Sequence, residues 1–281
     1  MHKIVRKKIF NPSVKLLEVY APLIARKAEP GQFIILRVNE EGERIPLTIA
    51  DYDREKGTVT IIFQEVGKTT KLLGMMEEGS EILDFVGPLG TASHFDNVKS
   101  AVVIGGGLGT AIAYPQAKKL NSMGVKVDAI IGFRNKDLVF MEEEMGKVSS
   151  SLTVMTDDGS NGNKGFVTDA LKKLIEEGNR YDVAIAIGPL VMMKFVSKIT
   201  REYNIKTIVS MNPVMIDGTG MCGGCRVTVG GETKFACVDG PDFDGHLVDF
   251  DEAMRRQQMY KCEERICDNI NGCTLEELKN G

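Results

Sequence analysis

The chain has 281 residues, enough for two domains and a smaller third segment. Its composition is that of a globular protein, with 43% hydrophobic and 26% charged residues and a net charge of −4. This mild acidity argues against nucleic acid or an anionic membrane as the main partner, because both select basic surfaces. No apolar run follows the first charged residues, and the longest apolar stretch, 101–114, is too short to cross a bilayer. We therefore expect a cytoplasmic protein.

The first hundred residues predict short β-strands separated by turns. Apolar and β-branched runs alternate with turn signals such as Glu29-Pro30-Gly31 and Lys56-Gly57. The expected strands are 14–20, 33–38, 47–50, 59–63 and 82–85, with one helix at 69–76. Strands of this length at this spacing predict a small antiparallel barrel over residues 1–98.

From residue 99 to residue 212, apolar strands alternate with helices. The expected strands are 101–104, 125–133, 152–156, 183–187 and 205–211, and the expected helices are 110–122, 167–177 and 189–203. This alternation predicts a doubly wound parallel sheet, whose strand carboxyl ends form the ligand-binding crevice.

The rest of the chain is rich in Gly and Cys. We expect a hairpin at 226–236 around the turn Gly230-Gly231, followed by a charged helix at 250–260. This pattern predicts a small module at 213–250 and a helical, Cys-containing tail at 251–281. All six cysteines lie between Cys222 and Cys273, and such clustering favours metal binding or redox chemistry over disulfides.

Three of the cysteines have the spacing of an iron–sulfur site. Cys222 and Cys225 form C-x2-C, and Cys237 follows after eleven residues. Plant-type [2Fe–2S] sites have the spacing C-x4-C-x2-C…C, and Asp217 stands at the first of these positions. Because a carboxylate can ligate iron, we predict a [2Fe–2S] cluster bound by Asp217, Cys222, Cys225 and Cys237.

Two alternatives to the iron–sulfur cluster remain open. Zinc accepts a Cys3Asp ligand set, although structural zinc sites favour four Cys or His ligands, and a zinc site would make the chain a nucleotide or redox sensor. The same cysteines could also be free thiols in a loop. Cys262, Cys267 and Cys273 have no evident fourth ligand, so ordinary thiols are favoured there.

A glycine-rich loop, Gly105–Gly109, lies between an expected strand and a helix that opens near Thr110. Backbone N–H groups and the positive end of the helix can bind a pyrophosphate there, although a plain tight turn would also use glycines. Gly188-Pro189, at the end of another strand, is a further candidate and could equally be a simple helix start.

Two carboxylates, Asp157 and Asp158, follow the expected strand 152–156. They can accept hydrogen bonds from ribose hydroxyls and would repel a 2′-phosphate, which favours NAD(H) over NADP(H). A solvated acidic turn is the alternative interpretation.

With these motifs placed, residues 1–210 resemble the ferredoxin–NADP+ reductase superfamily. Pro30–Phe33 is similar to the barrel motif of that family, and Arg44–Thr48 resembles its flavin motif with one extra residue before the hydroxyl. Val66–Thr70 resembles the segment that cradles the FAD pyrophosphate. Gly188-Pro189 and Met192 are similar to the Gly-Pro-x-x-Met nicotinamide motif.

The resemblance implies three cofactors, namely FAD, NAD(H) and the [2Fe–2S] cluster. The implied FAD-binding residues are Arg44, Pro46, Leu47, Thr48, Ile49, Val66, Gly67, Lys68, Thr69 and Thr70. The candidate NAD-binding residues are Gly106, Gly107, Leu108, Gly109, Thr110, Arg134, Asp157, Asp158, Gly188, Pro189 and Met192. Hydride transfer between two such cofactors needs their alignment rather than an amino-acid acid or base, so no catalytic side chain is expected.

The cysteine segment narrows the resemblance to two groups of electron-transfer subunits. A reductase core followed by this hairpin resembles the electron-transfer subunits of dihydroorotate dehydrogenase, which normally carry four cysteines. Asp217, together with the segments 221–229 and 235–241, is similar to the small subunits of electron-bifurcating NADH-dependent reduced ferredoxin:NADP+ oxidoreductases. The second resemblance, over about residues 1–255, implies a heterodimer with a large iron–sulfur flavoprotein subunit.

Overall fold

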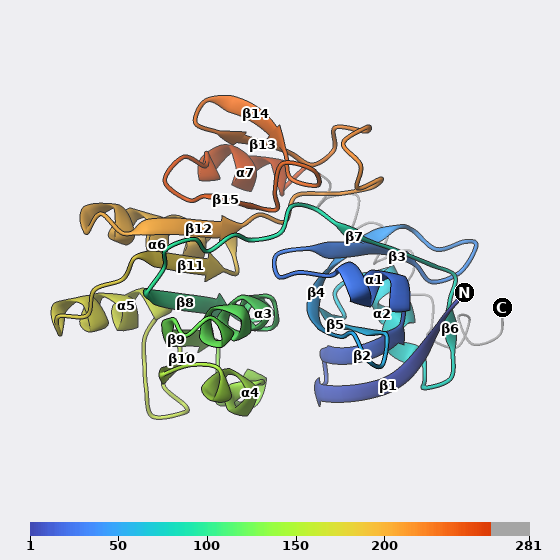
Figure 1. The fold of residues 1–281 in the computed structure, drawn as a ribbon, viewed down its shortest axis with the longest axis horizontal. Helices are drawn as coiled ribbons and strands as arrows, with labels where there is room; N and C mark the ends of the chain where they lie inside the picture. The colour runs from blue at the N-terminus through green and yellow to red at the C-terminus, as the bar shows by residue number, and fades with distance from the viewer. Residues whose placement is uncertain (260–281) are drawn as a thin grey trace.

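The computed structural model describes residues 1–259, which form a barrel, a parallel sheet and a smaller C-terminal module (Figure 1). The tail cysteines Cys262, Cys267 and Cys273 lie outside the described residues, so their role stays a prediction. Within residues 1–259, no helix has the length and the apolar character that a membrane span requires.

Seven antiparallel strands form the barrel in the order β6-β1-β2-β5-β4-β3-β7. They are β1 (His2–Asn11), β2 (Val14–Tyr20), β3 (Phe33–Arg37), β4 (Ile45–Asp53), β5 (Thr58–Gln64), β6 (Glu81–Ile82) and β7 (Asp84–Leu89), with helices α1 (Pro22–Lys27) and α2 (Lys68–Met75). Only Leu83 separates the two edge strands β6 and β7, so the chain itself nearly closes the barrel. The predicted antiparallel barrel is confirmed.

Strand β1 and helix α1 were not predicted. In β1 the charged residues are as many as the apolar ones, and only Ile4 and Asn11 are buried, so the strand lacks the alternation of a half-buried β-strand. Ile4 nevertheless packs in the barrel core with Leu17, Ile61 and Phe63.

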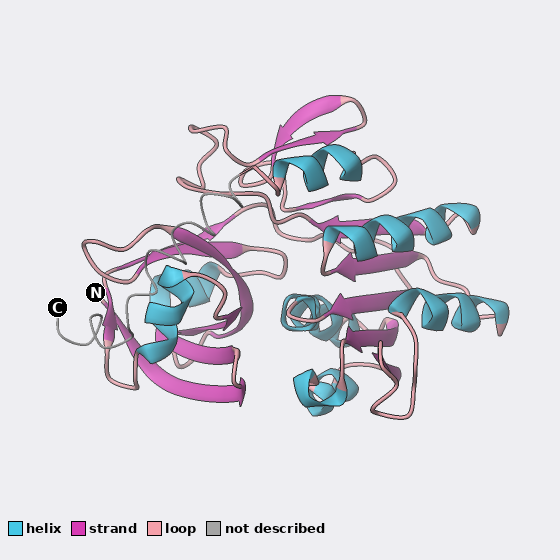
Figure 2. Ribbon diagram, turned by 180° about the vertical axis from the view of Figure 1, so that it is seen from behind, coloured by secondary structure: helices cyan, strands magenta, loops and turns pink. Residues whose placement is uncertain are grey.

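The second sheet has the order β10-β9-β8-β11-β12-β15. Its strands are β8 (Ser100–Gly106), β9 (Lys126–Phe133), β10 (Ser151–Thr156), β11 (Val183–Ile187), β12 (Lys206–Ser210) and β15 (Asp242–Asp244). The helices are α3 (Gly109–Ser122), η1 (Lys136–Leu138), α4 (Glu142–Lys147), α5 (Val167–Glu176) and α6 (Leu190–Glu202). Strands β8 to β12 are parallel, and α3 and α4 cover one face while α5 and α6 cover the other (Figure 2). The predicted doubly wound sheet is confirmed.

The strand order reverses between β8 and β11, because the chain runs outward to β9 and β10 before it returns to β11. Such a reversal leaves a crevice at the carboxyl ends of the two central strands, where nucleotides bind in folds of this kind. The glycine-rich loop follows β8, and Gly188-Pro189 follows β11, so both lie at this crevice.

The C-terminal module contains the predicted hairpin, β13 (Arg226–Val229) and β14 (Glu232–Phe235), and the helix α7 (Phe250–Arg256). Strand β15 was not predicted, since a three-residue strand with two aspartates carries no apolar pattern. It pairs antiparallel with β12, so the proposed module 213–250 contributes an edge strand to the sheet of the preceding segment. The segment boundaries at 98, 212 and 250 stay proposals.

One apolar core joins the three parts of the chain. It combines Phe33 and Ile35 of the barrel, Ile104 of the sheet, and Cys225 and Phe243 of the C-terminal module. The cysteine-bearing loop therefore packs against both of the other parts of the chain.

Candidate functional site

The four predicted cluster ligands lie together as two pairs. The Cys222 thiol donates to Asp217 Oδ1 at 2.9 Å, and the sulfur atoms of Cys225 and Cys237 are 3.3 Å apart. Cys222 is exposed, whereas Cys225 and Cys237 are buried. The structure thus brings the donors together within each pair, and the assignment of all four residues as ligands of one cluster stays a prediction.

The carboxylate and the buried thiols differ in protonation. The Cys222 thiol and then the Thr219 hydroxyl donate to Asp217 and hold the pKa of that carboxyl well below its usual range. Burial and the neighbouring Cys225 raise the pKa of Cys237 to about 12. Metal ligation requires thiolates, so binding of a cluster at this pair would release protons.

The two donor pairs have the grouping of ligands that a dinuclear cluster uses. A single zinc ion needs four donors around one point. Among residues 1–259, no group of three or more His, Cys, Asp or Glu side chains is arranged to hold one metal ion. In a [2Fe–2S] centre the protein ligands divide between the two irons, so two separate pairs of donors fit such a centre.

The cluster-bearing loop is seated on the barrel. Gly218 has φ +76°, and a Cβ there would lie 2.5 Å from Ile35 Cδ1 and 2.9 Å from Leu89 Cδ1. Only glycine combines this left-handed backbone with so close an approach. On the other side of the cluster, Thr91 donates through its N–H to Gly240 O at 2.6 Å and through its hydroxyl to Val238 O at 3.1 Å.

The strand that carries the predicted flavin motif turns one face toward the parallel sheet. Ile49 lies in the barrel core, and Leu47 packs against that core. Pro46 and Thr48 alternate with these residues, are partly exposed, and lie on the outer face of β4, the strand against which α3 packs. A flavin on this face would contact the side chains of Pro46 and Thr48, but only the backbone of Leu47 and Ile49. Arg44 is exposed just before the strand.

The N-terminal end of α2 is exposed at Val66 and Lys68, whereas the Thr69 side chain is buried. The Thr70 hydroxyl accepts hydrogen bonds from the N–H groups of Val66 and Gly67, each at 3.0 Å, so it caps the helix. The N–H groups of Lys68 and Thr69 have no partner within the helix and point from its positive end. A Cβ at Gly67 would meet nothing within 4 Å. Open space, free donors and an exposed lysine fit a pyrophosphate group.

The glycine-rich loop and Gly188-Pro189 meet at the crevice. A Cβ at Gly109 would lie 2.1 Å from Ile187 O, so only glycine lets α3 start this close to β11. The Met192 side chain lies over both segments, since a Cβ at Gly106 would be 2.4 Å from its sulfur and one at Gly188 would be 2.8 Å from its methyl carbon.

The other members of the loop differ in access. Gly107 has φ +55° and open space around its Cα, and Leu108 is partly exposed. The Thr110 side chain is fully buried and its N–H donates to Gly107 O at 3.1 Å, so Thr110 shapes the loop rather than offering a donor to a nucleotide.

The two predicted carboxylates of the nucleotide site are not equivalent. Both Asp157 and Asp158 are exposed at the end of β10, next to Arg134 at the end of β9. Asp158 Oδ1 accepts from the Ser160 N–H at 2.9 Å, and this turn lowers the pKa of its carboxyl. No hydrogen bond from the described residues engages the Asp157 carboxylate. Asp157 is therefore the better candidate for a ribose.

Sequence reasoning missed the residues that attach the cluster loop to its surroundings. Ile35, Leu89 and Thr91 lie more than a hundred residues before the loop that they contact. Their side chains are ordinary for strands and turns, so no local signal marks them.

Comparison with known proteins places the chain among electron-transfer subunits. Residues 212–249 match the family described as the iron–sulfur cluster binding domain of dihydroorotate dehydrogenase B. A dihydroorotate dehydrogenase B (NAD(+)) electron transfer subunit homolog of Thermotoga maritima is 46% identical over 266 residues, which are 95% of this chain and 94% of the relative. The corresponding subunit of Fusobacterium nucleatum is 36% identical over 221 residues, 75% of this chain and 83% of the relative.

A solved structure is similar over nearly the whole chain. It belongs to a study of flavin-based electron bifurcation by the NADH-dependent reduced ferredoxin-NADP oxidoreductase. The matching chain is 45% identical, the TM-score is 0.90, and the alignment covers 95% of this chain and 96% of the other.

Proposed function

This chain belongs to the family of dihydroorotate dehydrogenase B electron-transfer subunits and their homologues, and we propose that it is the small subunit of an electron-bifurcating NADH-dependent reduced ferredoxin:NADP+ oxidoreductase. In this role it passes electrons between NAD(H), FAD and a [2Fe–2S] cluster and on to a large iron–sulfur flavoprotein subunit. The proposal is carried by the donor set Asp217, Cys222, Cys225 and Cys237, arranged as two pairs.

Asp217 decides between the two groups of subunits. Dihydroorotate dehydrogenase subunits resemble this chain but normally carry a fourth cysteine at this position. Here the ligand is a carboxylate, and its low pKa keeps it ionised and ready to bind a cation. The likeness in fold and sequence to the ferredoxin-NADP oxidoreductase chain supports the same choice.

The protein contributes binding and alignment rather than acid–base chemistry. When bound, FAD supplies hydride exchange with the nicotinamide and single-electron exchange with the cluster. The outer face of β4 and the first turn of α2 would hold the flavin and its pyrophosphate. The Gly106–Gly109 loop, Gly188, Pro189 and Met192 would hold the dinucleotide at the crevice, with Asp157 and Arg134 toward its ribose end.

The visible spectrum of the purified protein tests this assignment. We expect flavin bands, red-brown iron–sulfur bands and equal amounts of iron and acid-labile sulfide. A colourless preparation that contains zinc would overturn the proposal and support the sensor alternative.

Dihydroorotate dehydrogenase is the second candidate, because the named relatives at 36% and 46% identity are such subunits or their homologues. Purification of the native complex from cells separates the two candidates. A large iron–sulfur flavoprotein subunit supports the first, and a dihydroorotate dehydrogenase catalytic chain supports the second. We also propose a cytoplasmic location, since ligand cysteines must stay reduced until iron binds.

A further inference from the structure

Asp242 is the first residue of β15, which pairs with β12 at the edge of the parallel sheet (Figure 1), and it contacts residues of α3 and of the segment after the barrel. The Ser93 hydroxyl and the Gln116 side-chain amide both donate to its Oδ2, the latter at 3.0 Å. Ser93 follows the barrel, Gln116 is on α3, and Ser210 of β12 is the cross-strand partner of Asp242. None of these residues belongs to the sites described above.

Two buried acceptor atoms of this cluster lack a hydrogen-bond partner. These atoms are Asp242 Oδ1 and Gln116 Oε1. The other polar atoms of the same two side chains, Gln116 Nε2 and Asp242 Oδ2, already form a hydrogen bond with each other. Gln116 is fully buried, so its amide is shielded from bulk water. A buried polar atom without a partner costs about 1–3 kcal/mol, which makes two in one pair unexpected.

We propose that Asp242 is a neutral carboxylic acid whose proton is shared with Gln116. A proton on Oδ1 can donate to Gln116 Oε1 while Gln116 Nε2 donates to Oδ2, so that acid and amide face each other through two hydrogen bonds. A single proton thereby satisfies both orphaned atoms, which an ionised carboxylate cannot do.

The surroundings favour the protonated form. Burial raises the pKa of Asp242, against the lowering by the hydrogen bonds from Ser93 and Gln116. No charged side chain on the packed elements is available to offset a negative charge: Lys118 and Lys119 of α3 pair with Asp51 and Glu29. The exposed ionisable groups nearest along these elements are His94, Lys206, Asp239 and Asp244.

This neutral pair makes Asp242 a positioning residue for the cluster. The segment between Cys237 and Asp242 is tied to the barrel through Thr91, and Met211 N donates to Pro241 O at 2.8 Å. The acid–amide pair adds the link to α3. The inference concerns protein side chains only and stands whether or not the proposed function is correct.

Infrared difference spectroscopy of the holoprotein tests the protonation. We expect the spectrum of wild type minus Asp242→Asn to contain the C=O stretch of a carboxylic acid, shifted in D2O. In Gln116→Leu this band should move to higher frequency, because the acid loses the donor to its carbonyl. Carboxylate bands in place of the acid band, or an acid band that Gln116→Leu leaves unshifted, would overturn the proposal.

The pH dependence of stability gives a second, independent readout. Asparagine offers an N–H donor and a carbonyl acceptor in place of the O–H and C=O of the protonated acid, carries one further N–H, and cannot ionise. Because the folded pKa of Asp242 is raised, the stabilisation from its proton is complete at acidic pH and is lost as the pH rises through that value. We expect equal thermal midpoints for wild type and Asp242→Asn at acidic pH and a higher midpoint for the variant at alkaline pH. A lower midpoint at alkaline pH would contradict us; Asp244→Asn, exposed on the same strand, is the matched control.

Discussion

The central strands of the parallel sheet and the cluster-bearing segment 213–250 differ in the origin of their buried contacts. Every residue of β11, and all but the first of β8, is buried between helices of the same domain. In the hairpin of the C-terminal segment only Val227 is buried, and the core around it includes Phe33 and Ile35 of the barrel. The face of the sheet beneath α3 and α4 therefore has a core without residues of 213–250, whereas the cluster segment shares its core with the barrel and the other face of the sheet.

Substitution of a predicted cluster ligand should have the largest effect on electron transfer, and this effect should be confined to the cluster-bearing segment 213–250. In Cys222→Ser we expect the iron–sulfur bands and electron exit to the partner subunit to be lost. Reduction of the flavin by NADH should persist, because the flavin and nucleotide sites lie on β4, α2 and the loops after β8 and β11. Visible spectra and anaerobic rapid kinetics measure both.

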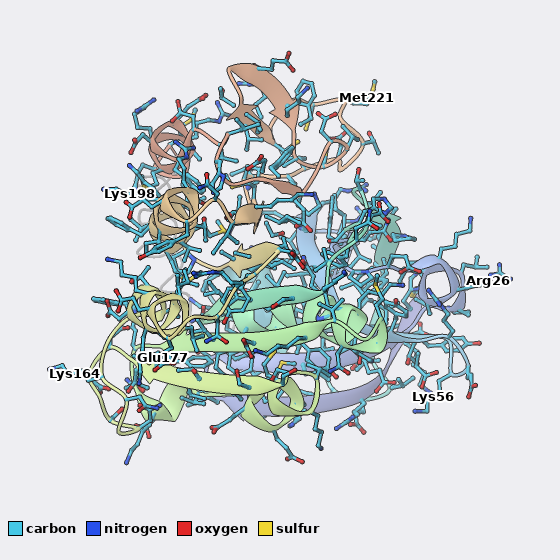
Figure 3. All side chains as sticks on the ribbon, turned by 60° about the vertical axis from the view of Figure 1, so that its left-hand side comes forward. Arg26, Lys56, Lys164, Glu177, Lys198 and Met221 are labelled. Carbon is cyan, nitrogen blue, oxygen red and sulfur yellow. The ribbon has the colours of Figure 1, made fainter. Side chains whose placement is uncertain are left out.

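The matched control for this variant is Met221→Ser. Met221 precedes Cys222, is 87% exposed and projects away from the fold at the edge of the loop (Figure 3). It should keep a normal cluster spectrum. Normal iron–sulfur bands in Cys222→Ser would remove Cys222 from the ligand set.

A substitution that creates a cavity in the parallel sheet should destabilise the sheet itself. Ile185 on β11 is fully buried in the core beneath α3 and α4, which contains no residue of 213–250, so Ile185→Ala should lower the free energy of unfolding by about 2–5 kcal/mol. The loss should be the same with and without the cluster, since this core and the cluster segment share no residue. Denaturant unfolding followed by circular dichroism measures it. Val191→Ala, at a 53% exposed position of α6, should cost less than about 0.5 kcal/mol. A cluster-dependent cost for Ile185→Ala would contradict the separation of the two regions.

The contact between the cluster loop and the barrel can be weakened by one methyl group. Gly218→Ala adds a Cβ against Ile35 and forces a left-handed residue, at a cost of about 1–2 kcal/mol for the backbone alone. We expect faster amide hydrogen exchange in 213–250 and unchanged exchange in β8 and β11.

Gly124→Ala is the matched control for the contact. Gly124 has φ +78°, close to the +76° of Gly218, but a Cβ there would meet nothing within 4 Å. It should carry the same backbone strain without loosening the cluster segment. Equal exchange in the two variants would show that the barrel contact does not order the loop.

The smallest expected effect concerns the nucleotide. Asp157→Asn should reduce the preference for NADH over NADPH by about 1 kcal/mol, roughly fivefold, because it removes the charge that repels a 2′-phosphate. Steady-state flavin reduction with both nucleotides measures this. Asp158→Asn is the comparison, since Ser160 already engages that carboxylate, and it should shift the preference less. A larger shift in Asp158→Asn would exchange the two roles.

Most of the fold was predictable because its signals are local. Strands such as β2 and β11 show apolar or β-branched runs of the observed length, and their predicted bounds agree with the structure. Strands β1 and β15 escaped prediction because each is held by pairing with a neighbour rather than by its own apolar pattern. A hydrogen-bond ladder contributed by a distant strand leaves no periodicity in the sequence.

The candidate sites also differ in how much of each could be predicted from local sequence. The spacing of Asp217, Cys222 and Cys225 predicts the metal ligands from sequence alone, because donors on one short loop lie close together in space. The difference between Asp157 and Asp158 appeared only when the Ser160 contact was known.

The sequence alone determined the chemistry of the cluster site, since ligand types and their spacing are properties of a short segment. The tertiary structure decided how that segment is held, through Gly218 on the barrel and Asp242 beside Gln116. These contacts join residues 126 or more positions apart, and the protonation of Asp242 depends on the burial that they create. Burial is a property of the folded chain, so no local sequence pattern could have predicted it.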